Sequence, residues 1–303
     1  MHGDEDGFSW RQTQVAVIGL GLMGGSWAGA VRPLVGRVIG YDVARAAADE
    51  ARRRGLVDEI VDELGPWLGE CRLVVMAVPP LAMGETARRC VCHMHPGSML
   101  TDLASVKEMV VEEVGAVLQA SPGVCYVPGH PLTGREKSGT QAAEPGLFRG
   151  APYVLCEPQP AGAPGERART ALAGLLTAMG ARVRFLSARE HDFLVAATSH
   201  LPYVVAVALC RLAASLREGH VGALELAASG FRDTTRVALS PPELWAEILA
   251  SNRRLPEAGR LLGREIEALL GAAYTAATGD GERLSGLLGE GRAVRDGLEK
   301  KVT

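Results

Sequence analysis

The sequence predicts an α/β fold, in which a doubly wound, mostly parallel sheet is followed by an all-α domain. Between residue 15 and about residue 187, short apolar runs alternate with helical patterns, as they do in sheets whose strands are joined by crossover helices. From about residue 188 the strand-like runs end, and long stretches carry apolar residues at helical spacing. We therefore expect two domains, residues 1–187 and residues 188–303.

The expected strands are short apolar runs, in order Val15–Gly19, Val38–Asp42, Leu73–Val78, Met99–Asp102, Cys125–Val127, Tyr153–Glu157 and Val183–Leu186. Helices are expected between most of them, including Ser105–Ala120 and Glu166–Met179. Leu73–Val78 is continuously apolar, which is typical of a strand covered on both faces. Pro79 and Pro80 end it, so the next loop lies at the carboxyl edge of the sheet, where cofactors bind.

The second domain is expected to be helical over His191–Leu216, Ala223–Ser229, Pro242–Ala250 and Ala258–Thr278. Several of these helices are apolar on more than one face, which indicates burial against a partner subunit. We therefore expect a homodimer that forms through the helical domain.

Composition excludes several classes of partner. The net charge of the 303-residue chain is only −3, so no strong field attracts nucleic acid or an acidic membrane. The most apolar stretch, Leu194–Cys210, is shorter than the roughly 18 residues that span a bilayer and is broken by Ser199, His200 and Pro202. The polar, acidic N-terminus is unlike a secretory signal, and six scattered cysteines suit a reducing cytoplasm. The Cys90–His95 segment is too compact to close a tetrahedral metal site, so no metal is expected.

A Gly-x-Gly-x-x-Gly fingerprint follows the first expected strand. Gly19 permits a tight turn, Gly21 lets the backbone approach a pyrophosphate, and Gly24 allows close packing of helix on strand. Asp42 ends the second strand, where a carboxylate accepts hydrogen bonds from ribose hydroxyls. This arrangement predicts a dinucleotide site, the alternative being a structural glycine turn. Asp42 favours NAD, because it would repel a 2′-phosphate, although the nearby Arg45 weakens that preference.

Two further segments of the first domain carry polar groups suited to chemistry. Ser105 lies at a strand-to-helix junction, where it either serves the site or caps the following helix. His130 lies in a loop rich in glycine and proline, which is typical of functional sites. A lone histidine in such a loop is either a catalyst or a structural, hydrogen-bonded residue.

The helical domain contains a third segment, Phe231–Arg236, with Trp245 and Asn252 further along the chain. Asp233 and Arg236 are three residues apart, a spacing that also suits an ordinary surface ion pair.

Together these segments resemble the prephenate/arogenate dehydrogenase family of tyrosine biosynthesis. The motifs in common are Gly-Leu-Gly-Leu-Met-Gly-Gly-Ser, Val-Pro-Pro, Asp-x-x-Ser-Val-Lys, Gly-His-Pro-Leu-x-Gly-x-Glu-x-Ser-Gly, Leu147-Phe148, Ser-His-Leu-Pro and Phe-x-Asp-x-Thr-Arg, in order between Val15 and Asn252. The resemblance implies a Rossmann-type NAD-binding domain, a helical dimerisation domain and a site in the cleft between them.

The resemblance also implies roles for individual residues. His130 is then the catalytic base, Ser105 its hydrogen-bonding partner and Arg236 the anchor of a substrate carboxylate. Further substrate contacts are expected at His200, Tyr203, Glu136 and Asp233, and cofactor contacts at Gly19, Gly21, Leu22, Met23, Gly24, Asp42, Val78, Pro79 and Ser105. For His200 a packing role is the alternative.

The expected reaction suits these residue types. Hydride leaves C4 of prephenate for the nicotinamide while the 4-hydroxyl loses its proton, and loss of the ring carboxylate then makes the ring aromatic. An imidazole accepts a proton well near neutral pH, and a guanidinium pairs with a carboxylate through two parallel hydrogen bonds.

One position departs from the family. Many members carry a second histidine three residues after His200, where this chain has Tyr203. The preference between prephenate, arogenate and a 4-amino analogue is therefore open, as are the strictness of NAD over NADP and inhibition by tyrosine.

Two other functions share some of these sequence features. A β-hydroxyacid dehydrogenase shares Gly-Leu-Gly-x-Met-Gly but needs a lysine at a glycine-rich helix start, and residues 191–209 contain neither lysine nor glycine. A non-catalytic NAD sensor would have no need of His130, Ser105 and Arg236 together, and an assay of NADH formation separates it from an enzyme.

Overall fold

The computed structural model describes residues 9–121, 123–134, 137–216, 224–277, 279 and 281–299. Its contacts divide the chain into two compact units, Met1–Arg254 and Leu255–Thr303. The predicted domain boundary at residue 187 falls inside the first of these units.

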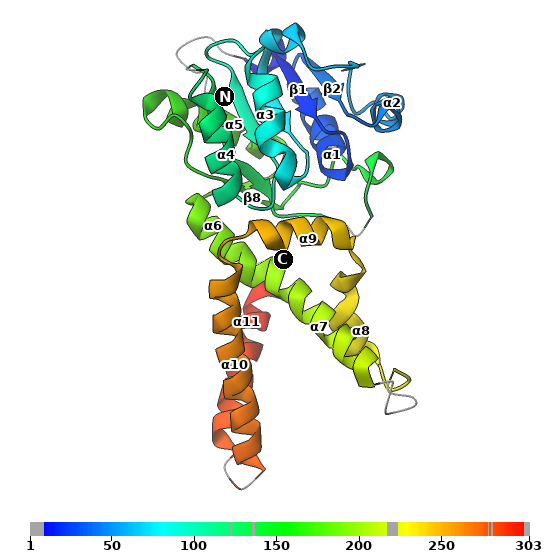
Figure 1. Ribbon diagram of the computed structural model, residues 1–303, viewed down its shortest axis with the longest axis vertical. Helices are drawn as coiled ribbons and strands as arrows, with labels where there is room; N and C mark the ends of the chain where they lie inside the picture. Colours follow the sequence, from blue (N-terminus) through cyan, green and yellow to red (C-terminus); the bar gives the residue numbers. More distant parts are fainter. Residues whose placement is uncertain are drawn as a thin grey trace. The chain divides into compact units, whose positions relative to one another are not determined.

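The core of the first unit is a six-stranded parallel sheet in the order β3-β2-β1-β4-β5-β6. Figure 1 labels two of its central strands, β1 and β2. Its strands are β1 (Gln14–Ile18), β2 (Arg37–Tyr41), β3 (Glu59–Ile60), β4 (Cys71–Met76), β5 (Met99–Asp102) and β6 (Cys125–Val127). This order is that of the dinucleotide-binding Rossmann fold, so the predicted doubly wound sheet is confirmed.

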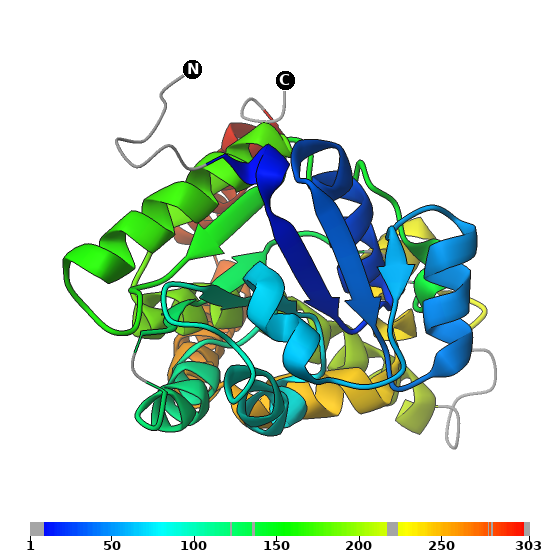
Figure 2. The ribbon, with the colours of Figure 1, turned by 90° about the horizontal axis from the view of Figure 1, so that it is seen from above.

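Helices cover both faces of this sheet (Figure 2). Alternate strand residues point to opposite faces, which explains why β1 from Val15 onward and β4 from Leu73 onward are apolar at every position. One face packs on α1 (Leu22–Val31), α2 (Arg45–Arg53) and α5 (Ala163–Ala178), and the other on α3 (Met83–Val91) and α4 (Glu108–Leu118). Short 3-10 turns occur at Trp10–Gln12, Arg32–Leu34, Pro66–Glu70, Pro80–Ala82 and Thr140–Ala142.

The last two predicted strands belong to a second sheet rather than to the parallel one. This sheet has the order β7-β8-β9, with β7 (Gly129–Pro131) antiparallel to β8 (Pro152–Leu155) and β8 parallel to β9 (Arg182–Phe185). β7 has only three residues and includes a proline, so no apolar run in the sequence announces it. It follows β6 after a single residue, Pro128, and carries His130 away from the main sheet.

The next helical run is continuous from Ala188 to Ser215, because α6 (Ala188–Val195) passes through the π-helical turn η6 (Ala196–His200) into α7 (Leu201–Ser215). The helix predicted over His191–Leu216 is therefore confirmed, and Ser199, His200 and Pro202 interrupt its apolar composition but not the helix. A π turn widens the helix just before Pro202, where the proline ring would otherwise crowd the preceding turn.

By length and composition alone this 28-residue run could cross a membrane, but a third of its most apolar window is buried within the chain. The buried polar residues His191, Asp192 and His200 also lie on it. Its apolar composition is that of a packing helix, so the run is weak evidence for a membrane.

The described residues between 224 and 254 form α8 (Ser229–Thr235), the 3-10 turn η8 (Arg236–Leu239) and α9 (Pro242–Ser251). The helix predicted over 223–229 is wrong for its described part, since residues 224–228 are non-helical and α8 begins only at Ser229. The second unit comprises α10 (Leu255–Ala276) and α11 (Glu282–Glu299). The sequence did not predict α11, whose glycines at 286, 289, 291 and 297 obscure the apolar period.

Candidate active site

The glycine loop between β1 and α1 has the geometry that its fingerprint predicts. Gly19 has a φ of +93°, which favours glycine, and a Cβ on Gly24 would lie 1.9 Å from the Gly19 carbonyl oxygen. A Cβ on Gly21 would meet nothing within 4 Å, so the backbone there is open to a bound molecule. Leu22 and Met23 form the first turn of α1, whose amide groups suit a pyrophosphate.

Asp42 lies beside this loop at the end of β2. Its carboxylate accepts hydrogen bonds from the Leu20 amide at 2.7 Å and the Ala44 amide at 2.8 Å. Arg45 instead pairs with Asp49 and Asp62, so its guanidinium is held by two carboxylates. A carboxylate at this position suits the ribose of NAD.

The other predicted cofactor residues lie on neighbouring loops at the same sheet edge. A Cβ on Gly19 would lie 3.3 Å from Cγ1 of Val78, which together with Pro79 follows β4. Ser105 lies in the loop between β5 and α4, is partly exposed and makes no hydrogen bond within the described residues. It does not cap α4, which begins at Glu108 with Lys107 as its N-cap residue.

A fully buried ion pair supports the chain beneath the site. The Lys107 ammonium pairs with Asp102 and also donates to the Gly129 carbonyl at 2.6 Å. Asp102 in turn accepts from the Tyr126 hydroxyl at 2.7 Å and from the Gly129 amide at 3.3 Å. These contacts hold the backbone immediately before His130, and breaking a buried pair of this kind typically costs about 3–5 kcal/mol.

His130 is partly exposed and begins a hydrogen-bonded series that continues through two buried residues of α6, His191 and then Asp192. Its Nδ1 lies 2.8 Å from Nε2 of His191, and Nδ1 of His191 lies 2.8 Å from Oδ1 of Asp192. The Asp192 carboxylate also accepts from the backbone amides of Lys107 at 2.7 Å and Glu108 at 2.9 Å. Asp192 therefore caps α4 from a distant segment, a role that sequence reasoning gave to Ser105 as one alternative.

The surroundings of the His130 imidazole keep it neutral. Desolvation by burial is the main cause that holds the pKa of His130 well below 6.5, and its neighbours His191, Lys107 and His200 lower it further. Burial likewise lowers the pKa of His191, although Asp192 opposes that shift. A neutral imidazole at a partly exposed position is able to accept a proton.

His200 belongs to the same group of side chains. The Asn252 amide nitrogen donates to the Asp192 carbonyl at 2.8 Å and lies 3.0 Å from Nδ1 of His200. Burial lowers the pKa of His200 to about 4. Trp245 packs edge-on against the His200 ring and face-to-face on the Tyr203 ring. His200 and Tyr203 are therefore tied to the His130 region through Asn252 and Trp245.

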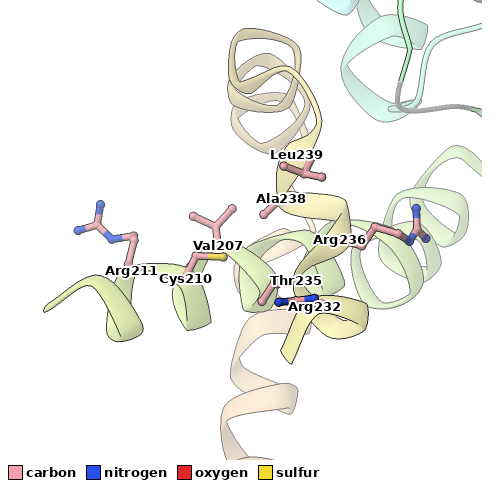
Figure 3. A pocket seen from close by; sticks show the side chains of 8 residues that line it. All are labelled: Val207, Cys210, Arg211, Arg232, Thr235, Arg236, Ala238 and Leu239. Atoms are coloured by element: carbon pink, nitrogen blue, oxygen red, sulfur yellow. The ribbon is translucent and has the colours of Figure 1, made fainter. Parts of the chain in front are cut away.

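Arg236 lies at a pocket of about 410 Å³ between α7 and the α8–η8 segment. Its walls are mainly apolar, and Arg211, Arg232 and Arg236 stand at its rim; Figure 3 shows Arg211 and Arg236 pointing in opposite directions, out of the pocket. Asp233 is exposed on α8. Glu136 lies outside the described residues. The convergence of Arg236 and His130 on one molecule remains a prediction.

Within the described part of the chain, no group of three or more histidine, cysteine, aspartate or glutamate side chains is arranged to hold a metal.

Comparison with known proteins identifies the architecture. The family model for the prephenate dehydrogenase nucleotide-binding domain matches residues 28–185, and the model for the prephenate dehydrogenase dimerization domain matches residues 187–288. The chain belongs to the prephenate dehydrogenase family. Membership confirms the predicted family, the oxidoreductase class and NAD as the cofactor.

Individual relatives agree with this family. The chain is 33% identical over 241 residues to the cyclohexadienyl dehydrogenase of Zymomonas mobilis, covering 78% of this chain and 80% of that protein. It is 32% identical to the prephenate dehydrogenase of Bacillus subtilis, over 79% of this chain but only 64% of that protein. The structure of prephenate dehydrogenase from A. aeolicus, in complex with hydroxyphenyl propionate and NAD+, matches with a TM-score of 0.85 at 25% identity, covering 95% of this chain and 98% of that one.

Sequence reasoning about this family member missed His191 and Asp192. His191 and Asp192 are adjacent in the chain. Only residues three or four positions apart are expected to interact on a helix, so this spacing does not predict a pair. The available signal was a histidine and an aspartate at the start of an apolar helix, where such residues are ordinarily exposed.

Proposed function

We propose that the chain catalyses the NAD-dependent oxidative decarboxylation of prephenate to 4-hydroxyphenylpyruvate, a step of tyrosine biosynthesis. The observation that carries the proposal is the imidazole of His130. It is partly exposed, has a lowered pKa and lies on β7, directly after the last strand of the nucleotide-binding sheet. A general base needs this combination of access and neutrality.

In the proposed mechanism His130 accepts the proton of the substrate 4-hydroxyl. NAD+, when bound, supplies the acceptor for the hydride that leaves ring C4. The ring carboxylate then departs as carbon dioxide, and its electron pair makes the ring aromatic. His130 returns its proton to the oxygen, which becomes the phenol. No net proton is gained or lost by the protein.

The chain's own residues supply binding and orientation. Gly19, Gly21 and the first turn of α1 would hold the pyrophosphate, and Asp42 would bind the ribose. Val78, Pro79 and Ser105 border the same edge of the sheet. Arg236 is proposed to orient the ring carboxylate, because too strong a grip on a departing group would oppose its loss. His200, Tyr203, Glu136 and Asp233 are proposed as further substrate contacts.

Arogenate is the alternative substrate, and the two acids differ in the side chain opposite the hydroxyl. Tyr203 replaces the histidine of many relatives at a position tied to His200 through Trp245. The preference therefore depends on how the Tyr203 hydroxyl meets a pyruvyl or an alanyl group.

We also propose that the chain forms a homodimer through its helical part, that the domains meet near residue 187 and that the enzyme works in the cytoplasm. The dimerization-domain match at residues 187–288 supports the first two proposals. Exposed apolar side chains on α7, such as Leu212 at 58% exposure, suit a partner surface. All six cysteines are free, which suits a reducing compartment.

The deciding experiment is a steady-state assay of nucleotide reduction with prephenate and arogenate, each with NAD+ and NADP+. We expect the highest kcat/KM with prephenate and NAD+. A higher value with arogenate would assign the alternative substrate. No reduction with either acid would refute the proposed function.

A further inference from the structure

We propose that His191 and Asp192 are positioning residues that fix the tautomer of His130, so that its Nε2 is the free, basic nitrogen, and that share the charge of the proton it accepts. This inference rests on the proposed role of His130 as the base. It concerns two buried residues that none of the sequence motifs brought forward.

The argument starts at Asp192, which the structure holds as a carboxylate. Two backbone amides at the N-terminus of α4 donate to it, and the positive end of the helix dipole favours a negative charge there. The Asn252 amide fixes the backbone of the same residue by donating to its carbonyl. An ionised carboxylate only accepts hydrogen bonds.

The protonation of His191 follows from this. Because Oδ1 of Asp192 can only accept, the hydrogen of the 2.8 Å contact belongs to Nδ1 of His191. Burial lowers the pKa of His191, so the ring is neutral and its other nitrogen, Nε2, carries a lone pair.

The same reasoning then applies to His130. The lone pair on Nε2 of His191 faces Nδ1 of His130 at 2.8 Å, so Nδ1 of His130 must donate. A neutral imidazole carries one hydrogen, and the free lone pair of His130 is therefore on Nε2. His191 and Asp192 are fully buried, whereas His130 is partly exposed, so the accessible ring belongs to the proposed base.

The hydrogen-bonded series of His130, His191 and Asp192 can also take up the proton of the substrate hydroxyl. When Nε2 of His130 takes the substrate proton, the hydrogen on Nδ1 can shift to Nε2 of His191. The positive charge then lies next to the Asp192 carboxylate, where an ion pair offsets it. No oxidant or additional reactant is needed, and the proton returns along the same atoms when the phenol forms.

Other buried groups bear on this titration. Lys107 lies close enough to lower the pKa of both histidines, and Asp102 raises that of His191. His200 faces His130 as well and is neutral at pH 7, since its pKa is lowered to about 4. Lys107 and Asp102 pair with each other, which leaves Asp192 as the carboxylate in direct hydrogen-bond contact with an imidazole of the series.

The first test reads the tautomers without any substrate. The full-length protein is labelled with ¹⁵N-histidine, and the imidazole signals are assigned by their loss in His130→Asn and His191→Gln. At pH 7.5 we expect both His130 and His191 to carry hydrogen on Nδ1. A hydrogen on Nε2 of His130 would overturn the proposal, whichever substrate the enzyme turns over.

The second test separates positioning from folding. His191→Phe removes the acceptor, whereas His191→Gln retains an oxygen that accepts from His130 but cannot take a proton. We expect kcat to fall about 10–100-fold in the phenylalanine variant and less in the glutamine variant, with KM and NAD+ affinity within twofold. The acid limb of the pH–rate profile should move in His191→Phe relative to wild type, because Nδ1 of His130 loses the ring nitrogen to which it donates.

The control is His95→Gln, an exposed histidine outside the site, which should leave kcat and the profile unchanged. Thermal unfolding of each variant checks that the fold is kept. Wild-type kcat in both His191 variants would overturn the proposal. So would a reduced kcat with an unmoved acid limb and an unchanged His130 tautomer, because that result indicates a purely structural role. Failure of His130→Asn to lower kcat would instead exclude His130 as the base and leave the tautomer result standing.

Discussion

Tyr203 stacks on Trp245 with ring centroids 4.0 Å apart and ring planes 1° from parallel. Trp245 also contacts the His200 ring edge-on, with centroids 6.0 Å apart. The three rings therefore form one aromatic group, and the Tyr203 hydroxyl makes no hydrogen bond within the described residues. A fixed ring with an unused donor is suited to recognise a polar group of the substrate.

Tyr203→Phe should therefore raise KM about tenfold, from the loss of one hydrogen bond worth roughly 1.5 kcal/mol, with little change in kcat or Tm. Steady-state kinetics with prephenate and arogenate measure the effect and show which side chain the hydroxyl contacts. Tyr203→Leu is the comparison, since it also removes the stack and should lower Tm. An unchanged KM for both acids in Tyr203→Phe would show that the residue only packs.

His130→Asn should lower kcat about 10²–10⁴-fold, the usual loss when a general base is removed. The glycine loop and Asp42 remain intact, so NAD+ affinity, measured by calorimetry, should stay within twofold. Turnover at the wild-type rate would exclude His130 from the mechanism.

Arg236→Ala should cost about 2–5 kcal/mol of substrate binding, mainly as a higher KM, if the guanidinium pairs with a desolvated carboxylate. Arg232→Ala is the matched control, because Arg232 borders the same pocket and is exposed. Its KM should stay within twofold of wild type. Equal losses in both variants would indicate a general effect of positive charge, and no loss in Arg236→Ala would exclude the anchor.

The stability of the protein should fall as the pH falls below 6.5. Burial lowers the pKa of His200 to about 4 in the folded chain, against about 6.5 in the unfolded chain. Above pH 6.5 the residue is neutral in both states and contributes no pH dependence. Below pH 6.5 only the unfolded chain binds the proton, so the free energy of unfolding drops, by about 2 kcal/mol at pH 5.

Urea unfolding at pH 7.5 and pH 5 measures this drop. The pKa values of His130 and His191 are lowered too, so these residues act in the same direction. The variant His200→Gln should lose the His200 share of the dependence while retaining that of the other two. An identical drop in wild type and variant would show that His200 does not contribute.

Local sequence patterns were sufficient to predict the glycine loop and the acid of the nucleotide-binding half of the molecule. The apolar run before Gly19, the glycine spacing and the acid at Asp42 each depend on neighbouring residues, so they can be recognised without coordinates. β7 could not be found in this way, because three residues that include Pro131 show no apolar period. Its pairing with β8 joins segments more than 20 residues apart.

The start of α4 illustrates the same limit. Residue types near Ser105 predict a helix from that position, yet α4 begins at Glu108. Asp192, 85 residues beyond Lys107, supplies the cap through its carboxylate. When the capping residue belongs to another helix, the residues next to the capped helix contain no pattern that predicts where it begins.

The sequence by itself determined the fold class and the family and singled out His130 as the candidate base, because these depend on periodicity and on short motifs. Only the tertiary structure decided what that histidine touches. His191 lies 61 positions away along the chain, and its contact with His130 exists because the second sheet and α6 bring the two rings together. Hydrogen-bond partners at such a separation depend on packing, which no local pattern of residues encodes.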